Sequence, residues 1–281
     1  MPTTSEKRNT FRRLHASGCF VLPNPWDVGS ARYLQHLGFE ALATTSSGAA
    51  FSMGLPDADW ALPRDAMLAH IATIAKASDL PVNADFASGY ADEPARVAAN
   101  VASCIETGVA GLSIEDASSD AAKPLYDFEL AVERIRAARA AIDAAGGDVV
   151  LTARTECFLV GRPDLAEATR RLEAFAEAGA DCLYAPGIGT REQIAAVVAA
   201  AAPKPVNVLV GGASRFRVRD LAALGVRRIS VGSALARAAW GGFLRAARGI
   251  AETGRFDALA EAPPFAELNA FFREDLERRK G

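Results

Sequence analysis

The sequence predicts a (β/α)8 TIM barrel with a C-terminal helical extension. Eight short apolar segments recur along the chain, segments with helical periodicity separate them, and four of these helical segments end in a glycine before the next strand. The chain has 281 residues, an ordinary size for a barrel of about 250 residues in one domain. We expect one domain over residues 1–281, with the barrel over about 20–240 and the extension over about 241–281.

The predicted strands are near-continuous apolar runs, as expected for strands that are covered on both faces. They are Val21–Asn24, Ala41–Ser46, Val82–Phe86, Gly111–Asp116, Val149–Thr155, Cys182–Pro186, Val206–Val210 and Arg228–Gly232. A doubly wound sheet is the alternative architecture, but it does not require eight units of such even length.

The segments between the strands carry apolar residues three and four positions apart, which is the spacing of one helix face. Helices are expected at Ala31–Leu37, Met67–Ala77, Pro94–Thr107, Leu130–Ala145, Asp164–Ala178, Arg191–Ala201 and Val218–Leu224. From Ala234 onward the chain contains a proline break and then a further helix with an apolar face. Such an extension is expected to pack on the barrel or on a partner subunit.

The composition excludes several classes of protein. Half of the residues are hydrophobic, 23% are charged, and the net charge of −3 is spread over interspersed acids and bases, so no nucleic-acid-binding surface is expected. The N-terminal segment has no apolar core of a signal peptide, and no run is apolar enough to cross a membrane, so a cytoplasmic protein is expected. The four cysteines show no paired spacing, which indicates reduced thiols.

The candidate functional residues lie at the carboxyl ends of the predicted strands, where catalytic groups are found in this fold. They are Thr45, Ser46, Ser47, Asp85, Glu115, Asp116, Arg154, Glu156 and Asn207. All three histidines lie elsewhere, so a histidine base or a zinc site is not expected. The chemistry is expected to use oxygen ligands, and therefore Mg2+, with Mn2+ as the alternative ion.

Strand alternation sorts these residues into two groups. If Asp85 points into the barrel mouth, Glu115 and Arg154 can point there too, whereas Asp116 faces outward and is expected to be structural. Two carboxylates on adjacent strands can converge on one cation, and Arg154 can bind a substrate carboxylate in bidentate fashion. The alternative is an ion pair between Arg154 and Glu115 that only stabilises the mouth, but three such residues on successive strands favour a site.

Two long loops are predicted on the same side of the barrel, over residues 48–63 and 117–128. Loops of this length in a compact barrel are often lids, and the alternative is a packed surface loop. Asp57 belongs to the first loop and would lie over the site on closure.

Five stretches of the sequence together resemble the isocitrate lyase/phosphoenolpyruvate mutase superfamily. They are NPWDVGSARYLQHLGFEALATTSSGAAFSMGLPD, ADFASGYADEP, GVAGLSIEDAS, LTARTECF and EAGADCLYAPG, and they follow one another from about Leu22 to Pro186. The barrel continues through GVRRISVG, so the resemblance covers most of the chain. Each motif alone is weak evidence for this resemblance, whereas the five motifs in this order are strong evidence for it.

The resemblance implies a magnesium-dependent enzyme that acts on 2-oxo or 2-hydroxy carboxylates. Asp85 matches the residue closest to the metal, and Glu115 matches an acid that reaches the metal largely through water. Asp57 matches the acid of a gating loop, and Arg154 matches the arginine that holds the substrate carboxylate.

The resemblance also assigns substrate contacts and an assembly. The run Thr45, Ser46 and Ser47 falls where the family uses small residues to contact the substrate, and we count Asn207 among the substrate-binding residues. The family is usually tetrameric with its C-terminal helix exchanged between subunits, so a dimer or tetramer of this chain is expected.

Three departures from the family pattern bear on function. Ala87 stands two residues after the metal aspartate, where the family usually has a second acid. The segment ASSDAAKPLYD lacks the cysteine that isocitrate and methylisocitrate lyases carry in this loop. The segment EDASSDAAKP also matches poorly the EDKxFPK loop of the phosphonate-acting members, with only Lys123 as a displaced candidate.

The sequence therefore predicts a carbon–carbon lyase or decarboxylase for a small 2-oxo or 2-hydroxy carboxylate of the oxaloacetate or methylisocitrate type. Cleavage would proceed through an enolate stabilised by the cation and Arg154, with Asp57 or Glu156 as a candidate acid or base. One alternative is an enzyme of the phosphoenolpyruvate mutase or phosphonopyruvate hydrolase type, which acts on P–C bonds. Another is a carboxylate-binding protein without turnover, suggested by Ala87.

Overall fold

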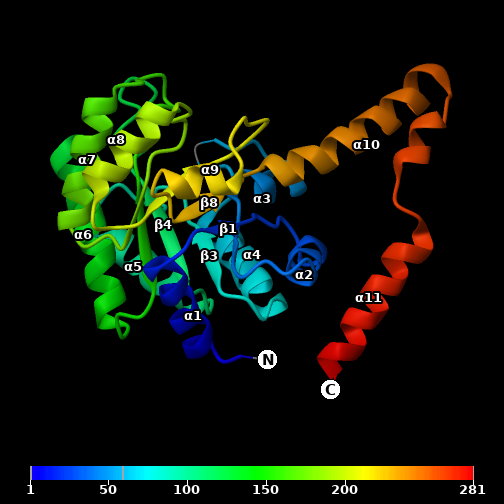
Figure 1. Ribbon diagram of the computed structural model, residues 1–281, viewed down its shortest axis with the longest axis horizontal. Helices are drawn as coiled ribbons and strands as arrows, with labels where there is room; N and C mark the ends of the chain where they lie inside the picture. Colours follow the sequence, from blue (N-terminus) through cyan, green and yellow to red (C-terminus); the bar gives the residue numbers. More distant parts are fainter. Residues whose placement is uncertain (1, 59, 281) are drawn as a thin grey trace. The chain divides into compact units, whose positions relative to one another are not determined.

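The computed structural model describes residues 2–58 and 60–280. Contacts within the chain divide it into a larger unit, Pro2–Ser233, and a smaller unit that begins at Ala234. The larger unit contains the eight strands and the helices between them (Figure 1). The single domain expected over residues 1–281 stays a prediction.

The larger unit is a parallel (β/α)8 barrel, which confirms the predicted fold class. Its strands are β1 (Phe20–Leu22), β2 (Leu42–Ala43), β3 (Val82–Asp85), β4 (Gly111–Glu115), β5 (Val150–Arg154), β6 (Cys182–Tyr184), β7 (Val206–Leu209) and β8 (Arg228–Ser230). Neighbouring strands pair in parallel in the order β1-β8-β7-β6-β5-β4-β3-β2. The backbone N–H of Ala43 donates to the Pro23 carbonyl at 3.0 Å, and this bond links β2 to the chain just after β1.

The seven predicted helices are present, with ends that differ by a few residues from the predicted ones. They are α2 (Val28–His36), α4 (Arg64–Ala77), α5 (Pro94–Glu106), α6 (Phe128–Ala144), α7 (Leu165–Glu177), α8 (Arg191–Ala201) and α9 (Val218–Ala223). Side-chain caps begin several of them: Asp164 accepts a hydrogen bond from the Glu167 N–H, and Thr190 accepts one from the Gln193 N–H. Gly38, Gly108, Gly179 and Gly225 follow four helices in the left-handed conformation, which confirms the predicted glycine C-caps.

Two helices of the larger unit were not predicted. Helix α1 (Thr4–Ala16) begins with a capping box in which Thr3 and Glu6 bond reciprocally, a pattern that is visible in the sequence. Helix α3 (Ser46–Ser52) lies where the second strand was expected to end and the first lid to begin. The second predicted lid also has structure of its own, because Ala117 and Leu125 form an antiparallel bridge.

The interior of the barrel is more polar than the apolar strands suggest. The Nη1 atom of Arg228 on β8 lies 3.5 Å from Oδ1 of Asn83 on β3, and its Nε donates to Oδ1 of Asn207 on β7 at 2.9 Å. Strands β8 and β3 are not neighbours in the sheet, so these side chains meet inside the barrel. Nη1 of Arg228 also lies 3.3 Å from Nε2 of His15, and burial together with Arg228 lowers the pKa of His15 to about 3.

Helix α1 closes the amino-terminal end of the barrel. Phe11 is fully buried and packs in one cluster with Phe20 and Val150 from the strands. A Cβ atom at Gly111 would lie 2.6 Å from Cε1 of Phe11, so only glycine fits beside this ring. The closed end directs any ligand to the opposite end, where the strands carry their polar residues.

The smaller unit consists of α10 (Ala234–Thr253), a 3-10 turn (Asp257–Glu261) and α11 (Phe265–Lys280). Large apolar side chains remain exposed on it: Phe243 is 59% exposed, Phe256 63% and Phe265 83%. No helix of the described residues is long and apolar enough to cross a membrane.

Candidate active site at the barrel mouth

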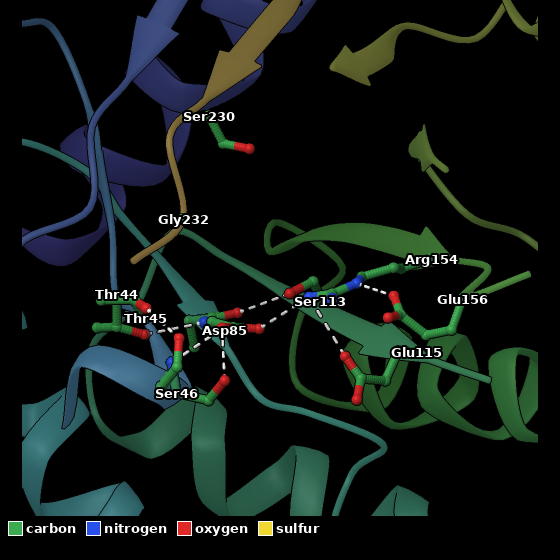
Figure 2. A network of polar contacts seen from close by, with 12 residues as sticks. Thr44, Thr45, Ser46, Asp85, Ser113, Glu115, Arg154, Glu156, Ser230 and Gly232 are labelled. Carbon is green, nitrogen blue, oxygen red and sulfur yellow. Dashed lines mark hydrogen bonds and ion pairs between the residues drawn. The ribbon is translucent and has the colours of Figure 1, made fainter. Parts of the chain in front are cut away.

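Three of the predicted site residues end adjacent strands and meet at the barrel mouth (Figure 2). Asp85 ends β3, Glu115 ends β4, and Arg154 ends β5. Glu115 and Arg154 are register partners in the sheet. Strand alternation therefore brought these side chains together as expected, while their roles stay predictions.

The Asp85 carboxylate is held in place by the start of α3. Its Oδ2 atom accepts hydrogen bonds from the backbone N–H and the hydroxyl of Ser46, both at 2.9 Å. The backbone N–H of Asp85 in turn donates to the Thr44 hydroxyl at 2.9 Å. These bonds fix one carboxylate oxygen and leave Oδ1 facing Arg154.

The Arg154 guanidinium lies among three carboxylates. Its Nη1 atom is 3.6 Å from Oδ1 of Asp85 and 3.3 Å from Oε2 of Glu115, and its Nε donates to Oε1 of Glu156. The Tyr184 ring lies beside the same group, with its centroid 5.2 Å from the guanidinium carbon. The ion pair considered as an alternative role for Arg154 is thus present, and it includes Asp85.

The same surroundings disfavour a charged Glu115. Burial raises the pKa of Glu115 most; Arg154 lowers it, and Glu156 and Asp85 raise it again, to about 8. When no further cation is present, Glu115 therefore holds its proton to a higher pH than an ordinary glutamate does. A divalent cation beside it would favour the ionised carboxylate.

Asp57 lies on the loop above the mouth and lines a cavity of about 260 Å3. Ser46, Glu115, Arg154 and Glu156 line the same cavity, so the structure places Asp57 with the predicted site. Its side chain stays exposed, yet the surrounding protein and the Asp85 charge raise the pKa of Asp57.

The other predicted substrate contacts lie in two places, at the start of α3 and inside the barrel. Thr45 is 1% exposed, and its hydroxyl caps α3 by accepting from the Gly48 N–H at 3.2 Å. The Ser47 hydroxyl lies 3.3 Å from that of Thr45. Asn207 is fully buried and donates to the Ser230 hydroxyl at 2.9 Å, inside the barrel rather than in the cavity that Asp57 lines. A substrate contact by Thr45, Ser47 or Asn207 stays a prediction.

Asp116 has the outward, structural position that alternation predicts. It is 3% exposed and accepts hydrogen bonds at 2.8 Å from the Thr155 hydroxyl and from the Glu156 N–H. Nη1 of Arg171 lies 3.2 Å from its Oδ2. Asp116 thereby holds the chain after β5, which carries Glu156.

Several residues around the site were not singled out from the sequence. Tyr184 is the register partner of Arg154 on β6, a relation that requires the strand pairing to be known. Trp60 and Tyr90 line the same cavity as Asp57 and have positive φ angles of 54° and 56°; Ala87, which the sequence did single out, lines it too and has a φ angle of 46°. Tryptophan, alanine and tyrosine are not residue types that favour a positive φ angle, so the sequence gives no signal for this conformation.

Two carboxylates at the barrel mouth are candidate ligands of a metal ion. Within residues 2–58 and 60–280, no group of three or more histidine, cysteine and acidic side chains is arranged to hold a metal. Asp85 and Glu115 nevertheless offer two carboxylates within 3.6 Å of one guanidinium nitrogen. Mg2+ prefers oxygen ligands and keeps several waters, so these two carboxylates fit a hydrated Mg2+ or Mn2+.

Comparison with known proteins identifies relatives along almost the whole chain. An uncharacterized protein of Mycobacterium tuberculosis (strain ATCC 25618 / H37Rv), Rv1998c, is 35% identical over 264 residues, covering 93% of this chain and 95% of its own. The oxaloacetate decarboxylase of Bradyrhizobium sp. (strain ORS 278) is 31% identical over 233 residues, covering 80% of this chain and 77% of its own.

Solved structures show the same relationship. A provisionally described lyase/mutase from Burkholderia cenocepacia J2315 has a TM-score of 0.91 at 48% identity, with 96% of each chain covered. An oxaloacetate acetylhydrolase in complex with its product oxalate has a TM-score of 0.84 at 28% identity, covering 100% of this chain and 99% of its own. The family model of phosphoenolpyruvate phosphomutase matches residues 11–251. The chain belongs to this family, within the isocitrate lyase/phosphoenolpyruvate mutase superfamily of lyases and related enzymes.

Proposed function

We propose that the protein is a Mg2+-dependent carbon–carbon lyase or decarboxylase, with Mn2+ as the alternative ion. Its substrate is a small 2-oxo or 2-hydroxy carboxylate, the class that includes oxaloacetate and methylisocitrate. The convergence of Asp85 and Glu115 on the Arg154 guanidinium carries the proposal. The decarboxylase relative and the oxalate-bound structural relative support the substrate class.

Arg154 binds the substrate carboxylate, because its planar guanidinium can donate two parallel hydrogen bonds. Glu156 orients it through the bond to Nε. The start of α3 brings Ser46 next to Asp85, and the N–H and hydroxyl of Ser46 hold the Asp85 carboxylate in position beside the bound acid. The substrate head therefore lies between the ends of β3 and β5.

Asp85 and Glu115 would hold the metal, which when bound supplies Lewis-acid stabilisation of the enolate charge left by C–C cleavage. Arg154 adds a fixed positive charge to the same region. Asp57 lies across the cavity on its loop, and its raised pKa suits a group that accepts or donates a proton.

We also propose that the chain forms a homo-oligomer, a dimer or tetramer, in the cytoplasm. The smaller unit exposes several phenylalanines, which a second copy can cover, with the C-terminal helix exchanged. No nucleic acid or membrane partner is proposed.

The test is turnover of a panel of acids with Mg2+ and with a chelator. Oxaloacetate, methylisocitrate and phosphonopyruvate are included, and carbon dioxide, 2-oxo acid or phosphate release is measured. Metal-dependent cleavage of a C–C bond, lost in Arg154→Met and retained in the exposed variant Arg170→Met, is the expected result. Turnover of phosphonopyruvate alone would identify a P–C enzyme, and metal-dependent binding without any turnover would identify a binding protein.

A further inference from the structure

We propose that Arg228, inside the barrel, binds the second carboxylate of a dicarboxylic substrate and so selects small 2-oxo or 2-hydroxy diacids over monoacids of the same length. The proposal rests on the proposed function, which supplies the first carboxylate on Arg154. It adds the residue that recognises the other end of the substrate, and it gives Arg228 a role in binding and none in bond cleavage.

Arg228 is a buried cation whose hydrogen-bonding partners are neutral. It is 2% exposed. Its Nε donates to Oδ1 of Asn207 at 2.9 Å, and its Nη1 lies 3.3 Å from Nε2 of His15 and 3.5 Å from Oδ1 of Asn83. In the described part of the chain, no ion pair joins Arg228 to a carboxylate. Buried charges in proteins are normally paired, so this guanidinium is suited to an anion that arrives with a ligand.

A small inner cavity connects Arg228 with the barrel mouth. The cavity measures about 40 Å3, and Asp85, Arg154, Tyr184 and Arg228 are among the residues that line it. A buried water occupies about 10–15 Å3 of such a cavity, so there is room for about three non-hydrogen atoms, the size of a carboxylate group. Arg154 also lines the cavity that Asp57 lines, so both spaces border the guanidinium that is proposed to hold the first carboxylate.

The strand pairing places the two arginines on one row of the inner face. Arg154 pairs with Tyr184, Tyr184 pairs with Asn207, and Asn207 pairs with Arg228. Register partners point to the same face of a sheet. Arg154 ends β5 whereas Arg228 begins β8, and because barrel strands are tilted the row descends from the mouth into the barrel. A diacid held by Arg154 at its first carboxylate can therefore direct its second one along this row.

The other charged groups at the mouth leave this role to Arg228. Arg154 is the only cationic side chain among the described residues that line the cavity of Asp57, so a second carboxylate would be desolvated there without a cation, which is costly. Asp85 lines the inner cavity, but its two carboxylate oxygens already face Ser46 and Arg154. The inner cavity is therefore the place where a diacid gains an interaction that a monoacid lacks.

The experiment compares two acids of equal chain length on the intact protein with Mg2+. Calorimetry gives the dissociation constants of malate, a diacid, and of 2-hydroxybutanoate, its monoacid counterpart, with oxalate as the head group alone. We expect malate to bind at least about tenfold more tightly than 2-hydroxybutanoate, and Arg228→Met to remove most of this preference. Oxalate and 2-hydroxybutanoate should bind this variant normally. Arg227→Met, at the neighbouring arginine that donates to the Gly18 carbonyl, is the control and should keep the preference.

Equal binding of the two acids, or unchanged malate binding in Arg228→Met, would overturn the inference and leave the proposed function standing if oxalate still binds. Absence of oxalate binding to the unaltered protein would overturn the proposed function and the inference with it. Circular dichroism checks that Arg228→Met folds. If it does not fold, the two acids on the unaltered protein decide the question: tighter binding of malate supports the inference, and equal binding overturns it.

Discussion

Nη1 of Arg154 lies 3.6 Å from Oδ1 of Asp85, although these residues end strands β5 and β3, which β4 separates. Glu115 of β4 and Glu156 contact the same guanidinium. Three carboxylates around one guanidinium leave a formal charge of −2 when all are ionised. A divalent cation would neutralise this charge, and without one the raised pKa of Glu115 favours its protonated form.

Replacement of Arg154 by lysine should weaken oxalate binding by about tenfold or more, because lysine keeps the charge but loses the two parallel donors. The dissociation constant is measured by calorimetry with Mg2+. Arg170→Lys, at a side chain that is 54% exposed on α7, is the control and should bind oxalate normally. Unchanged affinity in Arg154→Lys would remove Arg154 from the carboxylate site.

The stability of the metal-free protein should fall as the pH rises from 6 to 8. The folded state holds the Glu115 proton up to a pKa of about 8, whereas the unfolded state releases it near 4.5. Stability from this group is therefore present at low pH and lost as the pH rises through that window, by at most about 1.4 kcal/mol per pH unit. Urea unfolding with a chelator should show a shallower pH dependence for Glu115→Gln, and equal slopes would contradict the assignment.

Replacement of Asp116 by alanine should lower the free energy of unfolding by about 3 kcal/mol, because it leaves the buried Arg171 and the Glu156 N–H without this partner. Asp65→Ala, at a side chain that is 81% exposed, should cost less than about 1 kcal/mol. Urea unfolding of both variants measures the difference. Similar losses would mean that Asp116 does not hold the chain after β5.

Replacement of both Phe243 and Phe265 by aspartate should dissociate the oligomer. These phenylalanines are 59% and 83% exposed in the single chain, and in the proposed interface each aspartate would place a charge where an apolar side chain is covered. Light scattering at micromolar concentration measures the mass, and circular dichroism confirms folding. Leu37→Asp, at an exposed apolar residue of the larger unit, is the control and should not dissociate. A monomeric unaltered protein would contradict the proposed assembly outright.

The sequence predicted the parts of this structure that depend on local pattern. Apolar strand runs and glycine C-caps follow from neighbouring residues, and strand alternation is enough to bring Asp85, Glu115 and Arg154 together. The sequence could not predict the contact of Arg228 with Asn83, because that contact depends on which strands face each other across the barrel. Asn207 belongs to the same network through its hydrogen bonds to Ser230 and Arg228, and its contact with a substrate stays a prediction.

The cap of α3 was missed for a different reason. A serine and threonine run after a strand is compatible with a loop that contacts a ligand and with a helix start, and the local sequence does not separate the two. The structure uses Thr45 for the helix start and Ser46 for Asp85.

Oxalate binding with Mg2+ and with a chelator decides whether Asp85 and Glu115 hold a cation beside Arg154. Thermal unfolding of the unaltered protein should show a larger rise in melting temperature with Mg2+ and oxalate together than the two separate rises combined. Asp85→Asn should lose this metal-dependent part, and the exposed control Asp65→Asn should keep it. An equal rise with oxalate in the presence of chelator would contradict a metal site at these carboxylates.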